Sequence, residues 1–193
     1  MSEPAWDIAK LFPAQGTWTE DEYLELAAKH RRVEFDDGII EVLPVPTRTH
    51  QNILKRLLLR FDAYAQATGG RVSFAGTRLK LPGTTYREPD LLVATAPNVG
   101  YEAEEHWTGA DLVAEVVSPS AEDHDRDYVR KRDEYGRGGV AEYWIVDPEL
   151  MQVVVLVLRD GRYVEHCTYG RGEVARPATL VGVEVDVDAL FAG

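Results

Sequence analysis

Hydrophobic and polar positions follow the helical period of about 3.6 residues in three segments of the chain. These segments span 19–30, 47–68 and 122–137. The middle segment has the clearest apolar stripe, formed by Ile53, Leu54, Leu57, Leu58, Phe61, Tyr64 and Ala65. Threonines before the first two segments and glycine pairs after the last two fit helix caps. A last turn of helix is predicted at 187–191.

Shorter runs of apolar and β-branched residues between the helices predict strands. They lie at 33–35, 39–43, 71–75, 77–81, 89–94, 111–118, 142–148, 152–158, 162–168 and near 179–181. Asp36-Asp37-Gly38 and Arg159-Asp160-Gly161 separate neighbouring runs in the way that tight turns join hairpins. Because helices alternate with strands and with hairpins, the predicted fold class is α/β, more narrowly α+β: a central mixed sheet flanked by helices, with additional β-hairpins.

The predicted elements are arranged as one domain preceded by an arm. Residues 1–16 lack periodicity, whereas 17–193 show no repeat and no shift of composition that would mark a second domain. A chain of 193 residues with 45% hydrophobic content can bury one sizeable core. The polar pattern over 95–110 predicts a long loop within this domain, and such loops are often functional.

Composition favours a cytoplasmic protein without a membrane segment. No apolar run approaches the roughly 20 residues that cross a bilayer, and the N-terminus does not resemble a signal peptide. Cys167 is the single cysteine, so no internal disulfide can form, which fits a reducing compartment. It is expected to be a strand residue and not a nucleophile.

The net charge of −12 argues against a simple nucleic-acid-binding surface, since such proteins usually carry a basic patch. Basic residues nevertheless gather at 30–32, 55–56, 78–80 and 130–132. For any one of these clusters, an ordinary solvated face is the favoured interpretation.

One acid stands at the start of a predicted apolar strand, and another stands in the apolar middle of a second strand. Asp90 stands at the start of the strand that follows Pro89, and Glu115 stands in the middle of the run 111–118. Both faces of the second strand are apolar apart from Glu115, so it is predicted to be buried. A buried carboxylate is costly unless it is paired or bound to metal. If the strands are neighbours, the two acids converge on one ion, for which oxygen ligands favour Mg²⁺, Mn²⁺ or Ca²⁺.

A helix carrying a lysine follows these strands. Asp127, Lys131 and Tyr135 are spaced four residues apart and share one helix face. For the helix alone, an Asp127–Lys131 salt bridge is the favoured interpretation. Together with Asp90 and Glu115, a catalytic lysine is favoured, because an ammonium stabilises charge that develops on a phosphoryl group.

Two further polar residues are candidates for the same site. In the first hairpin, Glu34 faces away from Val33 and Phe35, and the hairpin alone predicts a solvent-facing glutamate. His50 extends the apolar stripe of the long helix toward its N-terminus. A histidine in such a place is more often structural than a ligand, unless the stripe ends at a site.

The ordered set of motifs resembles the Uma-type family of putative restriction endonucleases, within the PD-(D/E)XK nuclease superfamily. Each motif alone is weak, but the set covers about 17–190. The motifs are Val33-Glu34-Phe35-Asp36-Asp37-Gly38, a histidine that opens the next helix, Arg87-Glu88-Pro89-Asp90, Ala114-Glu115-Val116-Val117-Ser118-Pro119-Ser120, Asp127-x3-Lys131-x3-Tyr135 and Gly139-Val140-Ala141-Glu142-Tyr143-Trp144-Ile145-Val146-Asp147-Pro148.

The resemblance implies a restriction-endonuclease-like core that often forms a homodimer, with Mg²⁺ or Mn²⁺ as cofactor and nucleic acid, most often DNA, as substrate. Asp90 and Glu115 then become metal ligands, and Glu34 becomes an auxiliary acid of the metal site. Lys131 becomes the catalytic lysine. His50 also matches the family and is counted as a site residue whose role is open. Tyr135 and Trp144 match as well and are expected to serve in packing.

The sequence departs from the superfamily at one position. The superfamily's lysine follows two residues after the second acid, where this chain has Val117. Metal-dependent cleavage of a phosphodiester therefore requires Lys131 to reach the acids from its helix. The alternatives are a non-catalytic binding or regulatory module that retains the fold, and an enzyme that hydrolyses a small nucleotide, which tolerates an acidic surface better than DNA does.

Overall fold

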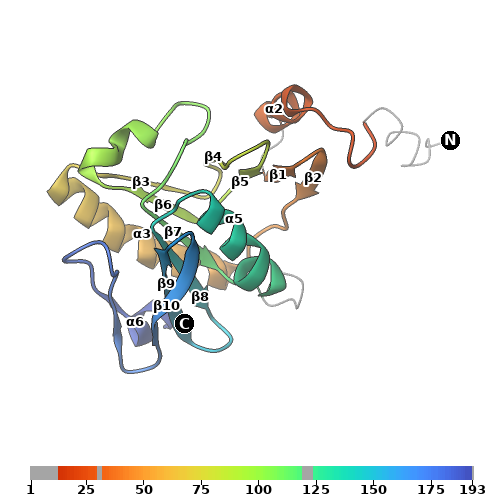
Figure 1. Cartoon of the computed structure of the whole chain (residues 1–193). Helices are drawn as coiled ribbons and strands as arrows, with labels where there is room; N and C mark the ends of the chain where they lie inside the picture. The colour runs from red at the N-terminus through yellow and green to blue at the C-terminus, as the bar shows by residue number, and fades with distance from the viewer. Residues whose placement is uncertain (1–12, 30–31, 119–123, 193) are drawn as a thin grey trace.

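A central sheet of six strands organises the computed structural model, which describes residues 13–29, 32–118 and 124–192 (Figure 1). The strand order is β10-β9-β8-β7-β6-β3, and only β7 and β8 run parallel, so the sheet is mixed as predicted. The strands are β3 (Arg71–Phe74), β6 (Leu91–Ala94), β7 (Leu112–Val116), β8 (Glu142–Asp147), β9 (Gln152–Arg159) and β10 (Arg162–Tyr169).

Helices cover both faces of this sheet. Helix α3 (Arg48–Thr68) and the short α6 (Val187–Phe191) pack on one face, where Phe61 meets Trp144 edge to face at 5.4 Å between ring centroids. Helix α5 (Lys131–Arg137) packs on the other face, where Tyr135 lies against Tyr143. Because side chains alternate across a strand, β7 contributes to both cores, which explains its continuous apolar run.

Helix α3 has the caps that the sequence predicts. The Thr47 hydroxyl accepts a hydrogen bond from the His50 amide at 3.2 Å, and Gly69 ends the helix with a left-handed φ of 78°. The caps place His50 in the first turn, at the end of the helix that lies beside the central strands. The N-terminal half of α3 thus positions a polar side chain, while its apolar stripe is buried in the core.

A second sheet lies beside the central one and packs on helix α2 (Glu20–Lys29). Its order is β2-β1-β5-β4, built from β1 (Val33–Asp36), β2 (Ile39–Val42), β4 (Leu79–Lys80) and β5 (Tyr86–Arg87). The predicted turn at Asp37 and Gly38 has positive φ angles of 43° and 84° and sets the register of β1 and β2. That register places Glu34 directly opposite Glu41, so both acids lie on one face of the hairpin.

Several predicted elements differ from the structure. The run 77–81 forms a strand only at β4, and 179–181 lies in a turn between two other short strands, β11 (Val174–Ala175) and β12 (Val185–Asp186). The loop 95–110 contains the 3₁₀ helix η1 (Ala96–Tyr101), which Asp111 holds by accepting hydrogen bonds from Thr95 and Asn98. These differences share a cause, because contacts with residues distant in sequence determine the conformation of short segments.

Parts of other predictions lie outside the described residues: 1–12 of the arm, residue 30 at the end of the first helix, 30–31 of the first basic cluster, and the third helix before residue 124. Within the described part, the arm is tied to the first hairpin, because the Gly16 amide donates to the Gly38 carbonyl at 2.8 Å. Among the described helices, none is long and apolar enough to cross a membrane.

Phe61→Ala should lower the free energy of unfolding by about 3–5 kcal/mol, because the ring projects from α3 and is fully buried against Trp144. Leu59→Ala on the same helix is the control, since that side chain is 60% exposed, and it should cost less than about 1 kcal/mol. Urea unfolding measures both. Equal losses in the two variants would contradict the packing of α3 described above.

Candidate active site

The two acids predicted from the strands meet at the end of β6 and β7. These strands are antiparallel neighbours that pair Leu91 with Ala114, so one further step of the register brings Asp90 opposite Glu115. The Val116 amide donates to Asp90 Oδ2 at 2.8 Å and fixes the aspartate to the neighbouring strand. The predicted adjacency of the two strands is therefore confirmed, and both carboxylates are almost fully buried.

His50 reaches this pair from the first turn of α3. Its Nε2 lies 3.0 Å from Asp90 Oδ1, so Asp90 is held by the histidine on one oxygen and by a backbone amide on the other. Burial lowers the pKa of His50, but the hydrogen bond and the charge of Asp90 outweigh it and raise that pKa above its ordinary value. The apolar stripe of α3 thus ends at the site, which was the condition for a functional histidine.

Lys131 enters the site from the opposite face of the sheet. Its Nζ lies 2.8 Å from Glu115 Oε1, 3.5 Å from Glu34 Oε1 and 3.8 Å from Asp127 Oδ1. The side chain is only 3% exposed. The salt bridge to Asp127 expected for the helix alone is present, but it is one part of a buried cluster in which three carboxylates surround one ammonium.

A widened helical turn precedes Lys131. Residues Arg126–Arg130 form the π-helical turn η2, which closes with the Lys131 amide donating to the Arg126 carbonyl. The hydrogen bond of this wider turn joins residues five apart in sequence instead of four, and such turns occur frequently at functional sites. The helix predicted at about 122–137 is present over its described part, 124–137, with η2 inserted before α5.

Tyr135, one turn after Lys131, also contacts Glu115. Its hydroxyl donates to Glu115 Oε1 at 2.5 Å, so this oxygen accepts from both the lysine and the tyrosine. The packing role expected for Tyr135 therefore holds for its ring, whereas its hydroxyl binds Glu115. Trp144 does serve in packing, and its indole N–H donates to the buried Glu142.

Glu34 is completely buried, so the solvent-facing position expected from the hairpin alone is wrong. Its Oε1 accepts a hydrogen bond from the Glu88 amide at 3.0 Å, and its Oε2 lies 3.6 Å from Arg87. Arg87 is itself buried and makes a bidentate pair with Glu134 on α5, at 2.7 and 2.6 Å. A chain of charges therefore ties the small sheet to the lysine helix.

The described polar groups enclose a cavity of about 30 Å³. This volume suits a single ion or water molecule and is far below that of a nucleotide site. Glu34 does not line it, whereas Glu88 does, and the Glu88 Oε2 atom is buried without a hydrogen-bond partner among the described residues. The polar and charged lining residues are Arg32, His50, Glu88, Asp90, Glu115, Ser118, Arg126 and Lys131.

Burial and neighbouring charges shift the protonation of the cluster. Burial raises the pKa of the Glu115 carboxyl, Lys131 offsets part of this rise, and the charges of Asp90 and Asp127 add to it, so the pKa is about 7. Burial lowers the pKa of Lys131, but Glu115, Glu34 and Asp127 outweigh it and hold the pKa above its usual range. The lysine is therefore charged, and the acids around it are in excess.

The arrangement fits a divalent cation bound by two protein carboxylates. Asp90 and Glu115 line the same small cavity, and Mg²⁺ commonly takes one or two carboxylates together with waters and phosphate oxygens. In the described ranges, no three His, Cys, Asp or Glu side chains form a group that could hold an ion. Glu34, expected from the resemblance as an auxiliary acid of the metal site, does not line this cavity and is engaged by Lys131, Arg87 and a backbone amide.

Comparison with known proteins identifies the family of this site. The sequence pattern of Uma2, described as "Putative restriction endonuclease", matches residues 20–188. The chain belongs to the Uma2 family. No curated protein matches significantly. The fold is similar to a crystal structure of "a putative nuclease belonging to DUF820" from Anabaena variabilis, with a TM-score of 0.69, 19% identity, and 90% of this chain and 97% of that chain covered. The predicted resemblance is confirmed.

Sequence reasoning did not single out three charged residues of this Uma2 site. Arg87 and Glu88 belong to a quoted motif but received no role, and Arg126 belongs to neither the motif nor the predicted set. The sequence signal for Arg87 was its place in the Arg87-Glu88-Pro89-Asp90 motif, three residues before Asp90. Glu88 and Arg126 line the cavity only because separate elements converge there, which the sequence does not display.

In metal-free buffer the free energy of unfolding should fall as pH rises from about 4.5 to 7. The folded state keeps a proton on Glu115 up to about pH 7, whereas the unfolded chain releases it near 4.5, so the unfolded state binds fewer protons in this window. Glu115→Gln has no proton to release at this position. Its free energy of unfolding should exceed that of wild type by up to about 3 kcal/mol at pH 8, but by little at pH 4.5.

Chemical denaturation at several pH values measures this difference. Glu149→Gln, at an exposed turn, serves as control and should track wild type at every pH. A Glu115→Gln variant that loses more stability at pH 8 than at pH 4.5 would show that Glu115 is charged and well paired at neutral pH, against the pKa shift described above.

Proposed function

We propose that this Uma2 chain is a divalent-metal-dependent nuclease that hydrolyses phosphodiester bonds in DNA, with Mg²⁺ or Mn²⁺ as cofactor. One observation carries the proposal: the Lys131 ammonium lies 2.8 Å from Glu115, whose neighbouring strand supplies Asp90, and all three line one cavity. Family membership and the fold shared with the structure titled "a putative nuclease belonging to DUF820" support the same reaction class.

Each residue has a role that follows from its contacts. Asp90 and Glu115 would hold the cation, which when bound supplies a Lewis acid for the phosphate. Lys131 stabilises the negative charge that develops on the phosphoryl oxygens, and it needs no reorganisation because it is already buried and charged. Glu34 and Tyr135 are positioning residues, the first for the lysine and the second for Glu115.

His50 is proposed to orient Asp90. Its Nε2 meets one carboxylate oxygen and leaves that oxygen's second lone pair available to a cation. A hydrogen bond from an imidazole to a metal-binding carboxylate fixes the direction of that carboxylate, and loss of such support typically costs 10- to 100-fold in metal affinity or activity. His50 therefore acts through Asp90.

A non-catalytic module is the second candidate, since Val117 occupies the superfamily's lysine position. Val117 is buried in the core beneath α5 and cannot supply charge. Lys131, however, has its ammonium beside Glu115 and not in solvent, so the charge missing at position 117 is restored from the helix. This observation favours the hydrolase over the module.

DNA is proposed over a small nucleotide because the matching family is described as "Putative restriction endonuclease", and the cavity of about 30 Å³ itself admits no more than an ion or a water molecule. A phosphodiester therefore has to lie across the mouth of the cavity, as an extended strand can. The homodimer and the cytoplasmic location stay predictions of the resemblance and of the composition; sedimentation of the purified protein tests the first.

With Mg²⁺ or Mn²⁺, the purified protein should cleave plasmid DNA or oligonucleotides, and EDTA should abolish cleavage. Asp90→Asn, Glu115→Gln and Lys131→Met should each lower the rate at least about 100-fold, because each removes a charge from the reacting centre. A parallel screen with mononucleotides separates DNA cleavage from hydrolysis of small nucleotides.

Lys29→Met and Asp133→Asn are the matched controls, since both side chains form exposed ion pairs on helices and should leave the rate unchanged. Circular dichroism establishes that all variants are folded. Metal-dependent cleavage that persists unchanged in Glu115→Gln and Asp90→Asn would trace the activity to a contaminating nuclease and overturn the proposal.

A further inference from the structure

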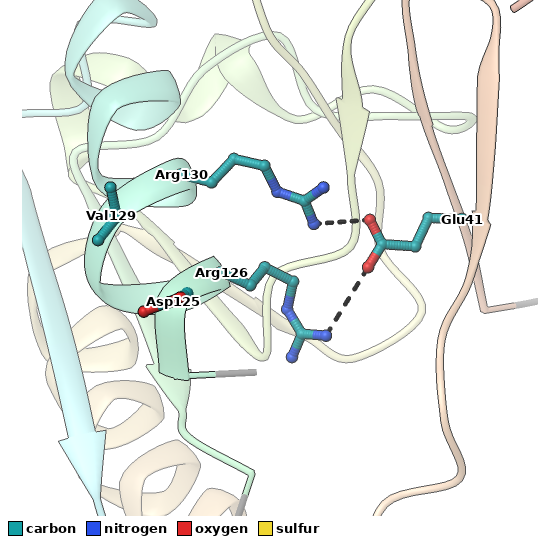
Figure 2. A pocket seen from close by; sticks show the side chains of 5 residues that line it. All are labelled: Glu41, Asp125, Arg126, Val129 and Arg130. Carbon is teal, nitrogen blue, oxygen red and sulfur yellow. Dashed lines mark hydrogen bonds and ion pairs between the residues drawn. The ribbon is translucent and has the colours of Figure 1, made fainter. Parts of the chain in front are cut away.

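Two arginines extend the proposed site toward solvent. Arg126 and Arg130 project from the turn η2 toward the hairpin of β1 and β2, and both meet the carboxylate of Glu41 (Figure 2). Arg130 Nη2 lies 2.6 Å from Glu41 Oε2, and Arg126 Nη1 lies 3.8 Å from Glu41 Oε1. The Glu41 carboxylate thus bridges two guanidinium groups.

A larger pocket opens at this pair. Its volume is about 480 Å³, within the range of ligand sites, and it is lined by Glu41, Asp125, Arg126, Val129 and Arg130. Arg126 also lines the small cavity that contains Asp90, Glu115 and Lys131. The two spaces are therefore neighbours that share one arginine, and an anionic strand that crosses the cavity would reach the pocket next.

The Arg126–Glu41–Arg130 arrangement has the chemistry of a phosphate site. Guanidinium groups bind carboxylates and phosphates with the same fork of N–H donors, and a phosphodiester likewise offers two charged oxygens to two arginines. The Glu41 and Arg130 side chains are 32% and 43% exposed, so solvent screens their ion pair and makes it weak. Replacing Glu41 by a phosphate is therefore inexpensive.

We propose that Arg126 and Arg130 bind a backbone phosphate of the substrate strand adjacent to the scissile one, and that Glu41 occupies this place in the free protein. The inference rests on the proposed nuclease function and names how its substrate is bound. It also explains how a chain of net charge −12 binds nucleic acid. The two arginines form a local positive patch, and Glu41 pairs with them when no strand is bound.

The test is binding of a fluorescein-labelled DNA oligonucleotide by wild-type protein in EDTA, where no cleavage occurs, over a series of salt concentrations. Arg130→Gln should weaken binding about five- to tenfold and reduce the slope of log affinity against log salt by about 1. Glu41→Gln should strengthen binding about two- to fivefold, because it removes the competing charge. The double variant should bind more weakly than Glu41→Gln alone.

Arg137→Gln is the matched control. Arg137 lies on the following helix α5, pairs with Asp133 at 2.9 Å and lines neither space, so its loss should change affinity less than about twofold. The sign of the Glu41→Gln effect separates the two interpretations of the pair. If Glu41 only pins the hairpin to the helix, its loss weakens or does not change DNA binding, and the inference is overturned.

Three further outcomes decide between sources of phosphate and between the two proposals. If millimolar inorganic phosphate displaces the oligonucleotide, and Arg130→Gln changes phosphate binding but not DNA binding, the site takes free phosphate and the inference fails. Equal DNA binding by Arg130→Gln and Arg137→Gln, alongside Mg²⁺-dependent cleavage by wild type, overturns the inference alone. Absence of both DNA binding and cleavage in wild type overturns the nuclease function and the inference with it.

Discussion

The burial of one ammonium group among three carboxylates constrains this structure more than any other interaction. Lys131 holds Glu115, Glu34 and Asp127 at 2.8–3.8 Å, and these acids come from the central sheet, from the small sheet and from the lysine's own helix. A buried charge without partners costs several kcal/mol. The two sheets and the helix therefore stabilise one another, because each supplies a charge that pairs with a buried charge of another. The charge cluster thus fixes how the two sheets and the helix meet.

The first hairpin shows how this constraint connects fold and function. Its tight turn sets Glu34 opposite Glu41, an arrangement that is unfavourable for like charges on its own. The helix that faces the hairpin offsets it with Lys131 for the inner acid and with Arg126 and Arg130 for the outer acid. The inner contact supports the proposed catalytic lysine, and the outer contact supplies the proposed phosphate site.

Local patterns predicted the parts of this fold that local interactions decide. The caps at Thr19 and Thr47, and the strand with two apolar faces that buries Glu115, depend on residues close in sequence, and all three are present. The meeting of Asp90 and Glu115 followed from one assumption about adjacent strands. Lys131 needed the family resemblance, because its spacing alone equally fits a surface salt bridge.

Other features depend on contacts that no local pattern encodes. Alternation placed Glu34 on the face opposite the small core, which in an isolated hairpin means solvent, but Glu34 is buried there and meets Lys131 of α5 and Arg87. The Tyr135 hydroxyl and Arg87 acquire their roles in the same way, since each pairs with an acid from a distant element. The π-helical turn that aims Lys131 has no sequence signature comparable to proline or glycine.

Nitrogen-15 NMR of the lysine side chains tests the central claim most directly, with the Lys131 signal assigned by its loss in Lys131→Arg. A charged, buried ammonium predicts slow hydrogen exchange, protonation that persists beyond the usual lysine pKa, and broadening of this signal before other lysine signals when Mn²⁺ is added. A Lys131 signal that exchanges like the surface lysines, titrates with an ordinary pKa and is unaffected by Mn²⁺ would contradict the account.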